Sequence, residues 1–346
     1  MELDSRRIHV AVAQTLALMV AVFAAGCQRS NTLSVEITVP RSLRETPIDG
    51  RILLLLSKGG RGEPRLEMRE PRNQISTDRN APQRFQFFGI DVDGLAPGTA
   101  ATVDASALGF PYDSLEKVPP GDYTVQAVLN VYETFSRKDG HVIKAPMDWG
   151  EGQKWNIKPG NLYSEPRTIR IDPAEGGRIQ ISLEKTIPPR PQPKETEHLK
   201  YVRMESKLLS EFWGRRMDLA AWVLLPDGFV EHPDARYPLV VDAAEFNEEF
   251  RGGAASFSPE PPPAGMEGAD PVAAEYNHKV YQDWTSGKMP RMLVVNIQHA
   301  NPYYGESFGV NSANMGPYGD AITSELIPHI ERTFRGRGEP WARTLI

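Results

Sequence analysis

A proline-rich run divides the chain into two parts whose hydrophobic patterns differ. Four of the seven residues at 188–194 are proline, and such a segment forms a stiff polyproline spacer without a core of its own. Apolar and polar residues alternate before it, whereas unbroken apolar runs and helical periods follow it. A length of 346 residues is sufficient for two domains. We therefore expect an export segment over residues 1–27, a domain over 28–187, a linker over 188–199 and a second domain over 200–346.

The alternation in the first part predicts a sheet structure. Residues 33–39 alternate apolar and polar side chains, as a half-buried strand does. Turn-forming residues are abundant, with 30 Pro and 29 Gly in the chain. Short strands between such turns predict an all-β sandwich of the immunoglobulin-like kind. The other strands that we expect lie at residues 51–57, 84–89, 122–135, 167–171 and 178–183.

The second part predicts strands that alternate with helices. Two apolar runs, at 238–244 and 291–297, are typical of strands buried on both faces, and further strands are expected at 202–208 and 217–225. Helices are predicted over 270–284 and 318–334, and Pro328 should kink or interrupt the second helix. Together these elements predict a parallel sheet that is covered on both faces.

Composition excludes several functional classes. A single cysteine excludes both a disulfide framework and a cysteine-based zinc site, and no residue spacing suggests another metal or a cofactor. The net charge of −6 is opposite in sign to that of most nucleic-acid-binding surfaces. We therefore expect no metal, no cofactor and no nucleic-acid partner.

The first 27 residues have the features of an export signal. Arg6 and Arg7 precede an apolar run over residues 10–26, which ends in small residues. The alternative is a membrane-spanning anchor, although a run of this length lies at the lower limit for crossing a bilayer. Ala-Ala-Gly before Cys27 resembles the lipobox of bacterial lipoproteins, which implies lipidation of Cys27 and, with Gln28 next, sorting to the outer membrane. Plain cleavage that leaves a thiol is the other possibility. Both predict an exported protein of the periplasm or outer membrane, which contacts a membrane only through this segment.

Aromatic residues late in the first part allow two interpretations. Trp149, Trp155 and Tyr163 lie close in sequence to Asp148 and Glu151. Aromatic faces and carboxylates together could bind a glycan, but large aromatic side chains more often pack the core and long loops of a sandwich. We favour packing.

Several segments of the second part together suggest a family. They are Ala-Trp-Val-Leu-Leu-Pro at 221–226, Tyr-Pro-Leu-Val-Val at 237–241, Asn-Pro-Tyr-Tyr-Gly-Glu-Ser at 301–307, Pro-Tyr-Gly-Asp at 317–320 and Glu-Leu-Ile-Pro at 325–328. Over residues 200–346 this pattern resembles the enterochelin-esterase-like group of α/β-hydrolases. The resemblance implies hydrolysis of a small-molecule carboxylic ester and a β-sandwich ahead of the hydrolase. It also implies that the strand ending at Ile297 is the fourth and that the fifth begins within residues 341–346.

The same resemblance implies where catalytic residues belong. An α/β-hydrolase carries its serine on the turn after the fifth strand, and the acid and the histidine follow in the chain. All three would lie beyond Ile346, so we expect the 346 residues to hold a scaffold and part of a substrate cleft, and to be inactive as given. The cleft candidates are His299, Asn301, Tyr304, Asn311 and Asp320, and the candidates for an oxyanion loop are Glu245 and Phe246.

Two of these assignments have alternatives. His299 follows a buried strand, where open α/β sheets place ligand groups, but it could equally be a hydrogen-bonded loop histidine. Gly305–Gly309 matches the nucleophile motif G-x-S-x-G around Ser307, and Asp320 and His329 follow in the expected order. A nucleophile turn needs a strand directly before it and a helix directly after it, whereas residues 301–304 and 309–312 are typical of loops. We therefore expect Ser307 to lie in a structured loop and not to be catalytic.

Two functions remain open at this point. The first is an exported esterase-like serine hydrolase. The second is a non-catalytic envelope lipoprotein whose sandwich binds a glycan or a protein partner.

Overall fold

The computed structural model describes residues 32–59, 62–67, 85–147, 154–191, 194–242, 257, 259–260, 271–298, 300–303 and 307–346. The predicted export segment with Cys27 lies outside these ranges and stays a prediction. The following predicted site residues also lie outside these ranges: Asp148, Trp149, Glu151, Glu245, Phe246, His299 and Tyr304. Among the helices within these ranges, none combines the length and the apolar character needed to cross a bilayer.

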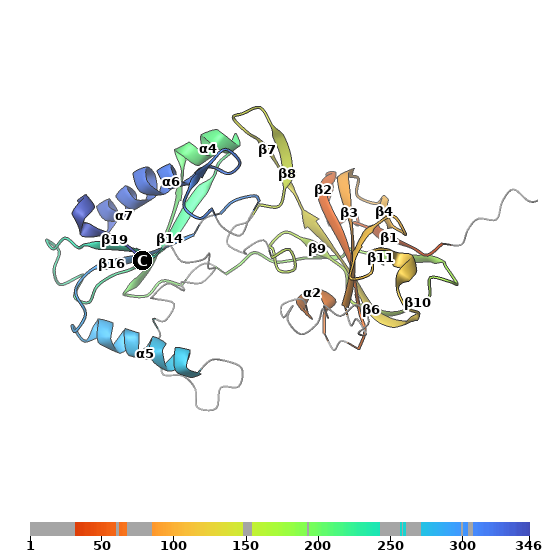
Figure 1. The fold of residues 1–346 in the computed structure, drawn as a ribbon, viewed down its shortest axis with the longest axis horizontal. Coiled ribbons are helices and arrows are strands. Elements are labelled where there is room, and N and C mark those ends of the chain that lie inside the picture. The colour runs from red at the N-terminus through yellow and green to blue at the C-terminus, as the bar shows by residue number, and fades with distance from the viewer. Residues whose placement is uncertain are drawn as a thin grey trace, which may run out of the picture.

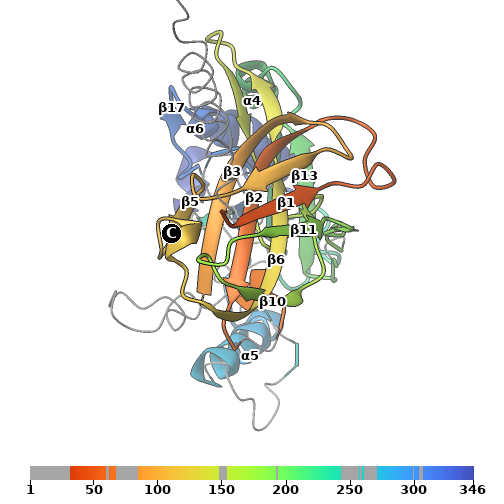
Figure 2. The same cartoon turned by 90° about the vertical axis from the view of Figure 1, so that its right-hand side faces the viewer.

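The first part is built from two β-sheets that pack face to face (Figures 1 and 2). In the smaller sheet, β1 (Ser34–Thr38) pairs in parallel with β11 (Arg178–Ser182) and antiparallel with β4 (Ala100–Val103). The larger sheet runs in the order β12 (Lys185–Thr186), β9 (Leu162–Tyr163), β6 (Gly121–Val131), β2 (Ile48–Ser57), β3 (Phe85–Leu95) and β5 (Leu108–Phe110), and β10 (Arg167–Ile171) also pairs with β6.

Alternating side chains of both sheets form the core between them. Ile37, Leu54 and Leu129 are completely buried there. On the other face of the larger sheet, a second buried cluster is formed by Leu53, Leu55, Val128 and Phe85. The prediction of a β-rich first part is therefore confirmed. Two short helical segments, α2 (Pro64–Glu67) and η1 (Leu115–Lys117), lie in its loops.

The prediction of one strand over residues 122–135 is wrong. β6 ends at Val131, and the chain continues as a separate hairpin of β7 (Glu133–Ser136) and β8 (Val142–Ala145). Tyr132, between the two strands, still donates its N–H to the carbonyl of Asp49 in β2, 2.9 Å away, before the chain leaves the sheet. The hairpin leaves the sandwich and reaches the second part of the chain (Figure 1).

A hydrogen-bonded network fixes α2 against the larger sheet. The Gln126 side chain is fully buried; its Nε2 donates to Glu63 at 3.0 Å and its Oε1 accepts from the Arg65 N–H at 3.0 Å. Arg65 also donates to Glu63 at 2.7 Å and to the carbonyl of Asn156 at 2.8 Å. Burial raises the pKa of Glu63, but the hydrogen bond from Gln126 and the charge of Arg65 outweigh it and hold the pKa below its usual value.

Because of this network, the free energy of unfolding should depend on pH in the acidic range. Because the pKa of Glu63 is lower in the folded protein, its ionised form adds stability above the unfolded pKa of about 4.3, and that stability is lost as the pH falls through the folded pKa. We expect Glu63→Gln to be less stable than the wild type at pH 7, with the difference shrinking below about pH 4. Urea unfolding of both proteins at pH 7, 5 and 3.5 measures this, and a difference independent of pH would contradict it.

The second part contains a five-stranded mixed sheet. Its order is β13 (Leu199–Glu205), β14 (Asp218–Leu224), β16 (Leu293–Gln298), β15 (Leu239–Asp242) and β19 (Arg343–Leu345). β15 pairs in parallel with β16 and β19, as expected. The prediction of an all-parallel sheet is wrong for β14, which runs antiparallel to both of its neighbours. The cause is the connection before it, because α4 (Lys207–Trp213) ends after two turns at Gly214 and the chain then returns along β13.

Helices cover both faces of this sheet (Figure 1). α5 (Pro271–Thr285) lies on one face, where Trp284 packs with Trp222, Leu224 and Val294. α4, α6 (Tyr318–Ala321) and α7 (Ile327–Thr333) lie on the other, over a core that includes Leu209, Tyr318 and Ile330. The β7–β8 hairpin and the segment after it join this second core through Phe135, Ala145 and Met147.

Two helix boundaries differ from those expected. The predicted strand at 202–208 ends at Glu205 because Ser206 caps α4, its Oγ accepting from the N–H of Leu209 at 3.2 Å. The predicted helix over 318–334 is interrupted by a π-helical segment, Ile322–Leu326, before Pro328 in the first turn of α7. Proline lacks an N–H and its ring crowds the carbonyl four residues earlier, so the wider turn accommodates it. The expected interruption at Pro328 is thus confirmed.

Candidate functional site

Buried polar side chains gather where the parallel strands β15 and β16 end. Asp242, the last residue of β15, is the register partner of Asn296 in β16, so both side chains lie on the α5 face of the sheet. Gln298 lies two residues further along β16, on the same face, and its Oε1 accepts from the Tyr201 hydroxyl at 3.0 Å. Burial raises the pKa of Tyr201, which keeps this donor protonated at neutral pH.

Asn296 is the unusual member of this group. Its side chain is 1% exposed, yet within the described ranges neither its amide nitrogen nor its amide oxygen has a hydrogen-bond partner. A buried group left without a partner costs about 1–3 kcal/mol, and native proteins keep few of them. Ligands of open α/β sheets bind at the carboxyl ends of the parallel strands, which is where Asn296 and Asp242 lie. We therefore take this edge as the candidate site.

Replacing Asn296 by leucine should stabilise the protein. The side chains are similar in size, and the change removes two buried polar atoms that lack partners, so the free energy of unfolding should rise by about 1–2 kcal/mol. Asn161 is the matched control, because it is also fully buried but bonds to Asn130, to Trp155 and to the N–H of Val131. Asn161→Leu should cost at least about 2 kcal/mol. Urea unfolding measures both, and similar losses for the two variants would mean that Asn296 has a partner.

The loop that follows β16 is held by its own contacts. Asn301 is completely buried, and its Oδ1 accepts from the N–H of Tyr303 at 3.2 Å. The Tyr303 ring packs against Trp213, with ring centroids 5.7 Å apart, and the Tyr318 hydroxyl donates to the carbonyl of Ala300. Asn301 therefore has a structural contact within the loop, and the loop packs against the core on the α4 side through Ala300 and Tyr303.

Ser307 does not lie in the geometry of a nucleophile turn. It is buried, and its Oγ accepts from the N–H of Gly309 at 3.2 Å. Phe308 has a φ of 53°, and the chain then enters the short strand β17 (Asn311–Ser312), whereas a nucleophile turn leads into a helix.

Neither Asp320 nor His329 is hydrogen-bonded to Ser307. They lie nine residues apart along α6, the π segment and α7, which corresponds to more than about 10 Å of helix. The described residues do not assemble these three side chains into a triad.

Asn311 and Asp320 meet at the start of α6. The Oδ1 atom of Asn311 accepts from the N–H of Asp320 at 3.0 Å, and both side chains are exposed. Gly319 allows this approach, since a Cβ there would lie 3.1 Å from that Oδ1 atom and 3.0 Å from the carbonyl of Gly309. Asn311 also borders a shallow cavity of about 300 Å³ together with Phe212, Ala313 and β18 (Gly316–Pro317).

The structure thus separates the residues that the sequence grouped together. Asn301, Asn311 and Asp320 hold the loop and the start of α6, whereas the buried polar edge consists of Tyr201, Asp242, Asn296 and Gln298. The sequence feature that could have indicated Asn296 and Gln298 is their position as polar residues at the end of an apolar run. In the ranges that the structure covers, no three His, Cys, Asp or Glu side chains are grouped closely enough to hold a metal ion.

Comparisons with known proteins add little to this geometry. No family model matches the chain, and no curated protein matches it. Among solved structures, a ferulic acid esterase is similar to it with 18% sequence identity and a TM-score of 0.28. The similarity covers 43% of this chain and 48% of that one, so it spans about half the length of the esterase chain.

Proposed function

We propose that the second part of the chain is an esterase-like hydrolase module whose cleft lies at the carboxyl ends of β15 and β16. The observation that carries the proposal is the sheet order: first, second, fourth, third and fifth strand, with only the second antiparallel. An α/β-hydrolase sheet begins with this order. The sequence motifs at 301–307, 317–320 and 325–328 support the same family.

The position of β19 supports a nucleophile on the turn after that strand. β19 is the fifth strand and pairs with β15, and α/β-hydrolases carry the serine on the turn directly after that strand. A serine following β19 would lie at the same sheet edge as Asp242 and Asn296. Asn296 has one donor group and one acceptor without partners, so it could bind a polar group of the ester beside that serine.

Ester turnover should not depend on Ser307. We expect Ser307→Ala to hydrolyse p-nitrophenyl acetate at a rate within about twofold of the parent, because removal of a nucleophile costs several orders of magnitude. The measurement uses the longest polypeptide that the gene encodes, beside a Ser312→Ala control. A loss of a hundredfold or more in Ser307→Ala alone would make Ser307 the nucleophile. Failure of that polypeptide to hydrolyse any short-chain aryl ester would contradict the esterase proposal itself.

The alternative function, glycan binding through Trp149 and Trp155, has less support. Trp155 is half-buried against the cluster of Leu53, Leu55, Phe85 and Val128, and Tyr163 packs beside it. The guanidinium of Arg65 covers the Tyr163 ring at 4.3 Å from its centroid. These contacts favour packing as the role of Trp155 and Tyr163.

A further inference from the structure

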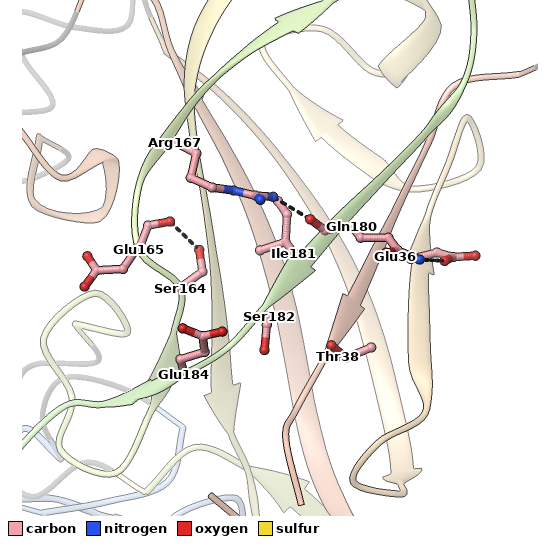
Figure 3. Close-up of a pocket in the computed structure, with 9 residues that line it drawn as sticks. All are labelled: Glu36, Thr38, Ser164, Glu165, Arg167, Gln180, Ile181, Ser182 and Glu184. Atoms are coloured by element: carbon pink, nitrogen blue, oxygen red, sulfur yellow. Dashed lines mark hydrogen bonds between the residues drawn. The ribbon is translucent and has the colours of Figure 1, made fainter. Parts of the chain in front are cut away.

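A cavity of about 420 Å³ opens on the sandwich, and Figure 3 shows the residues that line it. All of them belong to the first part of the chain, so the cavity is separate from the edge of β15 and β16. It lies where β1 and β11 of the smaller sheet approach β10 of the larger sheet. Its volume falls in the range of small-molecule sites. Its lining is mostly polar: carboxylates, hydroxyls, one guanidinium and, as an apolar member, Ile181.

Two of its three carboxylates already have cationic partners. Glu36 pairs with Arg178 at 3.2 Å and also accepts from Gln180 at 3.4 Å. Glu165 pairs with Lys185. These two carboxylates therefore add little net charge to the cavity.

Arg167 and Glu184 remain. Arg167 donates one N–H to the carbonyl of Gln180 and makes no further hydrogen bond with the part of the chain described, so most of its five N–H groups are available. Glu184 has no cationic or hydrogen-bonding partner there. The two charges are opposite, which leaves a cavity of about zero net charge with a strong donor and a strong acceptor.

We propose that this cavity binds a neutral polyhydroxylated ligand of one or two sugar units. A hydroxyl group can donate to the carboxylate of Glu184 and accept from the guanidinium of Arg167, and hydrogen bonds to charged groups are stronger than neutral ones. The carboxylate of Glu184 would repel an anionic ligand, and the guanidinium of Arg167 would repel a cationic one. An apolar ligand would remove both charged groups from water without replacing their hydrogen bonds.

A peptide strand fits this place less well. β11 is the edge of the smaller sheet, so an extended peptide could in principle pair with it. However, Arg167 already occupies the outward carbonyl of Gln180, which such a strand would need. A charged side chain over an edge is a common protection against strand pairing.

Binding can be tested by saturation-transfer NMR on the full chain with cellobiose, maltose and xylobiose. We expect saturable binding of at least one disaccharide with a dissociation constant on the order of 1 mM. Glu184→Ala and Arg167→Gln should each weaken it about tenfold, because each removes a charged hydrogen-bonding group. Arg170→Gln, on the same strand but outside the cavity lining, should leave binding unchanged.

The proposal would be overturned if none of the three sugars bound saturably at about 10 mM, ten times the expected dissociation constant. It would also be overturned if both cavity variants bound the sugars as the wild type does. The third contradicting outcome is that an extended neutral peptide binds at these residues in place of the sugars. Because ester turnover is not the readout, the result is independent of whether the second part is an esterase.

Discussion

Phe135→Ala is expected to lower the free energy of unfolding by about 3–5 kcal/mol, the usual cost of deleting a fully buried phenylalanine ring. The loss should occur in the second part of the chain, although Phe135 lies in the hairpin that continues from the sandwich strand β6. The reason is the position of the ring. It meets Trp213 of α4 edge-on, with ring centroids 5.4 Å apart, and Arg215 covers it at 4.9 Å.

Further contacts tie the β7–β8 hairpin to α4. Arg215 pairs with Glu133 at 2.6 Å, and the N–H of Lys138 donates to the carbonyl of Phe212 at 2.8 Å. Gly214 allows the backbones to approach: its φ is 66°, and a Cβ there would lie 2.1 Å from the carbonyl oxygen of Ser136. The hairpin is therefore part of the second hydrophobic core.

The matched control is Val142→Ala in the same hairpin. Val142 is 66% exposed, so its truncation should change the unfolding free energy by less than about 0.5 kcal/mol. Urea unfolding, monitored by tryptophan fluorescence, measures the unfolding free energy of both variants. Trp213 lies in the core that Phe135→Ala should destabilise, so its fluorescence reports on that core. Equal effects of the two substitutions would show that the hairpin does not support that core.

Glu331→Ala is expected to cost about 3 kcal/mol, the lower part of the range for breaking a buried ion pair. Glu331 of α7 is 5% exposed and accepts two hydrogen bonds from Arg343 of β19, at 2.9 and 2.7 Å. The lower value applies because the Arg343 side chain is 32% exposed and can recover part of its hydration. The pair fixes the edge strand β19 to the helix layer.

A double-mutant cycle with Arg343→Met measures this contribution. We expect a coupling energy of at least about 1 kcal/mol, because the two side chains form a bidentate contact. Arg332→Met, an exposed neighbour on α7, is the control and should be close to neutral. Additive effects of Glu331→Ala and Arg343→Met would contradict the predicted role of the pair.

Hydrophobic pattern predicted the position of most strands. β10 (Arg167–Ile171) has the expected bounds, and β15 and β16 lie within the apolar runs at 238–244 and near 291–297. β15 and β16 were predictable because their apolar runs are continuous, and β10 because Ile169 and Ile171 alternate with the exposed Arg170. Pro328 likewise indicated the interruption before α7, because its effect on a helix is local.

Features that depend on distant contacts were not predictable. The sequence around Tyr132 contains no glycine or proline to separate β6 from β7, and the chain leaves the sheet there so that Phe135 packs in the core of the second part. The direction of β14 is set by the short helix α4 before it, and the sequence pattern predicted a strand over 202–208 where that helix begins.

The candidate site shows the same limit. Motif spacing placed Asn301, Asn311 and Asp320 together as cleft residues, but spacing does not report which face a side chain occupies, and they hold the loop and α6. Asn296 was identified as a candidate site residue only from the structure, because a missing hydrogen-bond partner cannot be read from a sequence.

The most direct test of the account is to label the longest polypeptide that the gene encodes with a fluorophosphonate probe and to map the modified residue by peptide mass spectrometry. The account predicts that the probe modifies a serine following β19 and that Ser307 stays unmodified, including when Asn296 is replaced. Modification of Ser307 would contradict it, because the nucleophile would then lie in the loop before β17 and not on a turn after β19.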